Sequence, residues 1–100
     1  MKKKMPLIHP GEILFEEFLK PLAISQYRLA TDIHVSARRV NEIVHGTRAV
    51  SANTALRLAK ALNTTPAFWM NMQARYDLEV AEDSLADVIK KIEPINAQAA

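Results

Sequence analysis

The sequence predicts an all-α domain of five helices, with a candidate sixth helix near the carboxyl end. Its 100 residues suit one small domain, and 49% of them are apolar, which is enough to bury a compact core. Only two residues are Gly and five are Pro, so few turn residues interrupt the apolar stretches. Within those stretches, apolar residues recur every three or four positions, which is the helical spacing.

The first helix is expected from residue 11 or 12 to residue 20. Pro10 suits a helix start, because its missing N–H would have no partner there, and Pro21 is expected to stop the helix. Leu14 and Phe18 lie four residues apart and form an apolar stripe.

The second helix is expected to begin after Ser25, a typical N-cap residue, and to end near residue 33. Only His34 and Val35 separate it from a third helix, whose N-cap is Ser36. Two short helices joined by so tight a turn must cross steeply, so this segment predicts a helix-turn-helix.

The remaining helices are placed by similar signals. Gly46 suits the end of the third helix, Ser51 begins the fourth, and Asn63 can end it. The pair Thr65–Pro66 opens a fifth helix with a broad apolar face. We expect that face to be core, with a dimer interface as the alternative, and its residues are Phe68, Trp69, Met72 and Tyr76, followed by Val80. Residues 84–93 are the candidate sixth helix.

The third helix carries Arg38 and Arg39 in its first turn, where the helix dipole disfavours cations. An external anion would explain this placement, and the polar side of the helix fits the major groove of duplex DNA. We expect base-edge contacts from Ala37, Arg38, Asn41 and Glu42, and phosphate contacts from Ser25, Gln26, Ser36, Arg39, Thr47 and Arg48. The alternative is a solvated ion pair between Arg38 and Glu42, which are four residues apart.

The distribution of charge is uneven along the chain. Residues 1–60 hold ten Lys and Arg against five Asp and Glu, whereas residues 61–100 hold three against six. This asymmetry favours an anionic partner for the front of the molecule. The basic run Lys2–Lys4 is either a frayed end or an arm that contacts an anion.

Other functional classes lack a matching pattern. His9, His34 and His45 have no metal-ligand spacing and the chain has no Cys, so neither a metal site nor a cofactor is predicted. No catalytic motif occurs, so an enzyme is not expected. No apolar run is long enough to span a membrane, and the lack of Cys is compatible with a cytoplasmic location.

The stretch "SQYRLATDIHVSARRVNEIVHG" resembles the helix-turn-helix of Xre/Cro repressors. A wider match, which includes "HPGEIL", "RRVNEIVHGTRAVSANTALRLAKAL" and "FWMNMQARYDLEVA", resembles HigA-type antitoxins of the VapI subgroup over residues 6–81. One departure is His34, because the family commonly has Gly there in a left-handed backbone conformation, which His tolerates better than most residues.

The resemblance implies a lambda-repressor-like fold and a homodimer that binds double-stranded operator DNA, represses its own operon and neutralises a HigB-type mRNA-cleaving toxin. Two alternatives remain, a solitary repressor without a toxin and a module that binds mainly other proteins. We expect a flexible basic arm over residues 1–9, the DNA-binding domain over 10–82, and a helical extension with a tail over 83–100.

Overall fold

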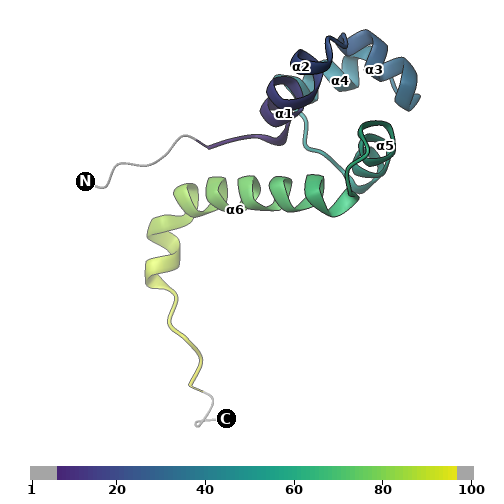
Figure 1. Cartoon of the computed structure of the whole chain (residues 1–100). Coiled ribbons are helices and arrows are strands. Elements are labelled where there is room, and N and C mark those ends of the chain that lie inside the picture. The colour runs from purple at the N-terminus through teal and green to yellow at the C-terminus, as the bar shows by residue number, and fades with distance from the viewer. Residues whose placement is uncertain (1–6, 97–100) are drawn as a thin grey trace.

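The computed structural model describes residues 7–96, which form helices and loops without a strand. Figure 1 shows a cluster of short helices from which one long helix extends. In chain order the elements are α1 (Pro10–Ile13), the π-helical η1 (Leu14–Leu19), α2 (Lys20–Leu22), α3 (Gln26–Ile33), α4 (Ala37–Val44), α5 (Ala52–Leu62) and α6 (Pro66–Lys91). The first three are consecutive, so they make one helical rod and the expected five-helix, all-α class is confirmed.

The first rod does not stop at residue 20 as expected, because Pro21 lies inside it and the helix ends at Leu22. A proline ring in a regular α-helix collides with the carbonyl group four residues earlier. Just before Pro21 the Lys20 N–H donates to the Phe15 carbonyl oxygen, five residues back, in a wider π-helical turn. This wider turn gives the ring room, and the chain leaves the helix at Ala23, whose φ is 56°.

The expected fifth and sixth helices are a single helix, α6, so the expectation of a separate sixth helix over residues 84–93 is wrong. The polar residues near position 82 interrupt the apolar pattern, but neither Pro nor Gly follows Pro66 inside the helix. Polar residues alone do not stop a helix. In Figure 1, α6 runs beyond the other helices and changes direction toward its carboxyl end.

The core lies between the first rod, α3, α4, α5 and the first half of α6. Its fully buried side chains include Leu14, Leu29, Val40, Ile43, Leu58 and Trp69. The Trp69 indole N–H donates to the Thr64 hydroxyl oxygen at 2.8 Å, so this large side chain is buried with its polar atom satisfied.

Gly11 is the point at which α1 approaches the backbone of α4. A Cβ atom on Gly11 would lie 1.7 Å from the Ile43 carbonyl oxygen, far inside van der Waals contact. Only glycine permits this approach. The contact packs the buried side of α4, at Ile43, against the first rod, and the opposite face of α4 is left exposed.

Candidate nucleic-acid interface

The elbow between α3 and α4 has the expected caps. The Ser25 hydroxyl oxygen accepts from the Arg28 N–H at 2.9 Å, and that of Ser36 accepts from the Arg39 N–H at 3.1 Å. His34 has a φ of 62° and a ψ of 48°, so the expected left-handed conformation is confirmed for a non-glycine residue. The two helices therefore meet at a fixed turn, as a helix-turn-helix requires.

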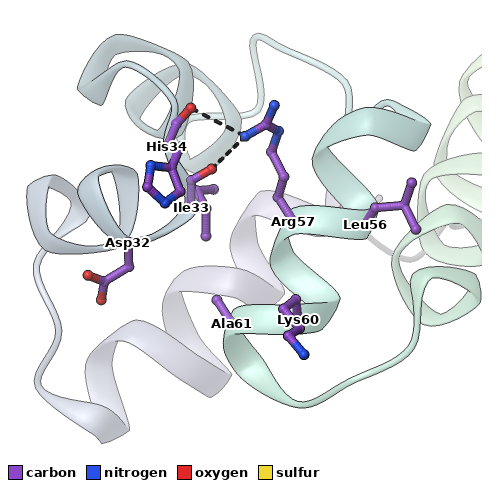
Figure 2. Close-up of a pocket in the computed structure, with 7 residues that line it drawn as sticks. All are labelled: Asp32, Ile33, His34, Leu56, Arg57, Lys60 and Ala61. Carbon is purple, nitrogen blue, oxygen red and sulfur yellow. Dashed lines mark hydrogen bonds between the residues drawn. The ribbon is translucent and has the colours of Figure 1, made fainter.

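Arg57 of α5 donates hydrogen bonds to the backbone of this elbow (Figure 2). Its Nη1 atom lies 2.8 Å from the Ile33 carbonyl oxygen and 3.3 Å from that of His34. Its Nε atom donates to the Asn53 side chain at 2.7 Å. A cation at the carboxyl end of α3 is favourable for the helix dipole, so Arg57 stabilises both the helix end and the strained turn.

The exposed face of α4 carries most of the expected base-edge residues. Ala37, Arg38 and Asn41 are exposed, and the Arg38 side chain has 85% of its surface accessible, whereas Glu42 is half-buried. Val40 and Ile43, on the opposite side, are buried. Among the expected phosphate-contacting residues, Gln26 and Arg39 are half-buried, and the exposed ones are Ser25, Ser36, Thr47 and Arg48.

The two helices of the elbow are also joined through their exposed faces. The Asn41 amide nitrogen donates to the Gln26 side-chain oxygen at 3.0 Å. Gln26 is the first residue of α3, and Asn41 lies in the middle of α4. The amide of Asn41 thus has a fixed orientation before any partner arrives.

Glu42 accepts from two arginines at once. Arg38 Nε lies 2.9 Å from one of its carboxylate oxygens, and Arg48 Nε lies 2.8 Å from the other. Hydrogen bonds from Arg48 and Arg38 hold the pKa of the Glu42 carboxyl below its usual value, so this group is ionised at neutral pH. The ion pair between Arg38 and Glu42, which the sequence offered as an alternative, is therefore present in the free chain.

The turn after α4 brings Arg48 back to Glu42. Gly46 has a φ of 76°, and its N–H donates to the Ile43 carbonyl oxygen, while the Thr47 N–H donates to that of Glu42. This pair of hydrogen bonds is a Schellman motif. The Thr47 hydroxyl also donates to the Glu42 carbonyl oxygen, at 3.2 Å. Thr47 therefore ties the loop to the last turn of α4.

Arg39 differs from Arg38 in its surroundings. Its Nη1 atom lies 3.4 Å from the Asn53 side-chain oxygen, which Arg57 also contacts. Arg39 is directed toward α5, whereas Arg38 pairs along α4 with Glu42. The two neighbouring arginines thus occupy different sides of the helix.

The residues for which a dimer interface is the alternative separate into two groups. Trp69 has no accessible surface and Met72 packs against the core, so these side chains have the core role that the sequence analysis preferred, and Trp69 is unavailable to a partner. Phe68 has 39% of its surface exposed. Tyr76 packs edge-on against His9, with ring centroids 4.9 Å apart.

The expected arm over residues 1–9 mostly lies outside the described residues, but its last residue belongs to the domain. His9 is buried, and its Nδ1 atom accepts from the Gly11 N–H at 2.9 Å, which caps α1. Burial lowers the pKa of His9, against a smaller opposing effect of the Asp77 carboxylate. The assignment of His9 to a flexible arm is wrong because the ring is packed between α1 and α6.

Gln73 and Arg57 have structural roles that the sequence pattern does not predict. The Gln73 side-chain oxygen accepts from the Val50 N–H at 2.7 Å, and its amide donates to Asp77 at 2.9 Å. A polar residue inside the apolar face of α6 was the available signal for Gln73. The binding of Arg57 to the elbow has no local signal, because the Ile33 and His34 carbonyl groups lie more than twenty residues earlier.

The described part of the chain also limits other site types. Residues 7–96 contain no cluster of three or more His, Cys, Asp or Glu side chains that could hold a metal ion. Within the same range, no helix is sufficiently long and apolar to cross a membrane.

Comparison with known proteins places these features in a family. The helix-turn-helix family model matches residues 15–69. Virulence-associated protein I of Dichelobacter nodosus is 52% identical over 81 residues, which cover 81% of this chain and 75% of that protein. Antitoxin HigA-1 of Vibrio cholerae is 33% identical over 94 residues, which cover 94% of this chain and 89% of that protein.

A solved structure gives the same result for the fold. The structure of Pseudomonas aeruginosa antitoxin HigA with the higBA promoter superimposes with a TM-score of 0.87 at 43% sequence identity. The match covers 91% of this chain and all of that one. This chain therefore shares its fold with a protein whose structure was solved with promoter DNA.

Proposed function

Because this chain belongs to the Xre-type helix-turn-helix family that includes the HigA antitoxins, we propose that it binds operator DNA as a homodimer, represses its own operon and neutralises a HigB-type toxin. The exposed polar face of α4 is the observation that supports DNA binding. Close packing at Gly11 fixes the buried side of this helix, and the hydrogen bond from Asn41 to Gln26 fixes its exposed side. The similar antitoxin solved with its promoter supports the same role.

In this proposal α4 enters the major groove with its amino end toward the bases. Arg38 can donate two hydrogen bonds to a guanine, and Asn41 can pair with an adenine. Ala37 is small enough to contact a thymine methyl group, and Glu42 can accept from a cytosine amino group.

The residues around the face would hold the DNA backbone. The amino end of α3, at Ser25 and Gln26, offers free N–H groups and a side-chain amide to a phosphate. Ser36 and Arg39 lie at the amino end of α4, and Thr47 and Arg48 follow its carboxyl end. These contacts would set the register of the helix in the groove without reading the sequence.

The homodimer is proposed to form through the part of α6 that extends beyond the core. Its exposed apolar residues recur at intervals of three, four or seven, which is the spacing of a helix that pairs with another helix, and they are Leu78, Leu85, Val88 and Ile89. A dimer would place two α4 helices about one DNA turn, or roughly 34 Å, apart on a pseudo-palindromic site.

Sedimentation at increasing protein concentration tests the dimer. We expect the wild-type chain to sediment as a dimer and Leu85→Glu to sediment as a monomer, because a charge at a helix pairing face is costly. Asp87→Asn, an exposed change on the opposite side of the same helix, is the control and should remain dimeric. A wild-type monomer at all concentrations would contradict this arrangement.

Toxin neutralisation is tested in cells. The gene next to this one is expressed alone and together with this chain, and growth is measured. We expect growth arrest with the neighbouring gene alone and recovery with both. No arrest, together with intact operator binding, supports the solitary repressor, the second candidate function.

A further inference from the structure

Glu42 is the single acidic residue of α4, and it lies at the half-buried edge of the face that we propose for DNA. Each of its carboxylate oxygens is occupied by a different arginine, at 2.9 Å from Arg38 Nε and 2.8 Å from Arg48 Nε. Only 26% of the Glu42 side chain is accessible, against 85% for Arg38. The carboxylate is therefore held in place while its partners reach into solvent.

The backbone around Glu42 keeps this arrangement together. The Thr47 N–H and hydroxyl both donate to the Glu42 carbonyl oxygen, at 2.9 and 3.2 Å. These bonds fold the loop so that Arg48, six residues later, returns to the same carboxylate. The backbone conformation at the end of α4 therefore brings the three charged side chains together.

We propose that Glu42 is a specificity-determining residue, which weakens binding to duplex DNA other than the operator by occupying Arg38 and Arg48. This inference rests on the proposed operator binding. A phosphate and a carboxylate are both anions, so they compete for the same guanidinium groups and repel each other. Binding to phosphates alone, which dominates on random DNA, is therefore opposed by Glu42.

Recognition of a base avoids this competition. Glu42 engages the Nε atom of Arg38, which leaves the two terminal nitrogens able to donate to guanine O6 and N7. Those acceptors carry no net charge, so the carboxylate does not have to leave. Glu42 then lowers the affinity for random duplex more than it lowers the affinity for the operator. The ratio of operator affinity to random-duplex affinity is therefore higher than it would be without the carboxylate.

The test compares Glu42→Gln with the wild-type chain, using fluorescence anisotropy with the promoter duplex and with a scrambled duplex over a series of salt concentrations. Glu79→Gln is the matched control, because it removes the same charge from another i,i+4 pair with an arginine, on α6. Thermal unfolding of each variant verifies that the fold is retained, and sedimentation verifies an unchanged assembly.

We expect Glu42→Gln to bind the scrambled duplex about threefold to tenfold more tightly than the wild type does, with a salt slope steeper by about one. The ratio of operator to scrambled affinity should fall, and Glu79→Gln should leave it unchanged. In an Arg48→Ala background the gain from Glu42→Gln should shrink, because one of the released arginines is missing.

An unchanged affinity for scrambled DNA, or an equal gain in Glu79→Gln, overturns the role of Glu42. The proposed operator binding fails separately, if the wild-type chain itself does not distinguish the promoter from the scrambled duplex. Failure of the proposed operator binding is observed with the wild-type chain alone, whereas failure of the role of Glu42 is observed with the variants, so the two outcomes are distinguishable.

Discussion

The side chains of Gln26 and Asn41 are hydrogen-bonded to each other across the elbow, with 3.0 Å between the Asn41 amide nitrogen and the Gln26 oxygen. One residue begins α3 and the other lies on the exposed face of α4. The bond therefore couples a position proposed for a phosphate to a position proposed for a base. Its consequence is that the amide of Asn41 presents a fixed pattern of donor and acceptor to the groove.

Replacing Gln26 by Ala should weaken operator binding by about 0.5–1.5 kcal/mol, because Asn41 loses the group that orients it. Isothermal titration calorimetry with the promoter duplex measures this change. Asn71→Ala removes another exposed side-chain amide, from α6, and should have no effect. Equal affinities of the two variants would show that the bond between Gln26 and Asn41 has no part in recognition.

Replacing Arg38 by Ala should weaken operator binding by about 1–3 kcal/mol and relax the preference at one base position. The physical reason is the loss of a bidentate donor to one guanine. Binding of a set of promoter duplexes, each with one base pair changed, locates that position. Arg75→Ala breaks a similar pair with Glu79 on α6 and serves as the control. A loss of the same size on every duplex would reduce Arg38 to a phosphate contact.

Replacing Gly11 by Ala should lower the free energy of unfolding by about 3 kcal/mol, because its Cβ would overlap the Ile43 carbonyl group. The collision is with backbone, so no side-chain rotation relieves it. Urea unfolding followed by circular dichroism measures the change. A stability equal to that of the wild type would mean that α1 does not contact α4 in this way.

The stability of the domain should fall as the pH drops below the ordinary His9 pKa of 6.5. Burial lowers the pKa of His9 in the folded chain, so the unfolded chain binds the proton more readily. Acidification therefore stabilises the unfolded state relative to the folded state. Protonation of Nδ1 would also remove the acceptor for the Gly11 N–H. Between pH 7.5 and 5.5 carboxyl groups contribute little to the pH dependence of stability, so histidine side chains dominate it, and a His9 variant is needed to isolate the effect of His9.

His9→Asn tests that assignment. Asn is a favourable N-cap residue that does not titrate, so it keeps an acceptor for α1. The variant should lose less stability than the wild type between pH 7.5 and 5.5 in the same urea experiment. Identical pH dependence in both proteins would assign the effect to other groups.

Local features of the fold were predictable from the sequence. The caps at Ser25, Ser36, Ser51 and Thr65 and the left-handed turn at His34 depend on residues close together in the chain, and all are confirmed. Such features are set by local hydrogen bonds, and one sequence is enough to recognise them.

Features that depend on distant segments were not predictable. Gly11 meets Ile43, Gln73 meets Val50 and Arg57 meets Ile33, and each pair is more than twenty residues apart. Sequence periodicity identifies the buried side of a helix but not its neighbour. The length of α6 was not predictable for another reason. The hydrophobic pattern changes near residue 82, which indicates the end of a helix, but the helix continues through this change.

Part of the candidate site was also predictable. The exposed positions of Arg38 and Asn41 follow from the burial of Val40 and Ile43 on the other side of the same short helix. The double pairing of Glu42 does not follow, because Arg48 lies beyond the helix and returns only through the turn at Gly46 and Thr47. Individual contacts of these residues with bases and phosphates remain predictions.

Binding of the chain to its own promoter duplex and to a scrambled duplex of the same length, at about 150 mM salt, is the most direct test of operator recognition. We expect the promoter duplex to be bound at least about a thousandfold more tightly, with two protected half-sites about one helical turn apart. Equal binding of the two duplexes would contradict operator recognition by this chain.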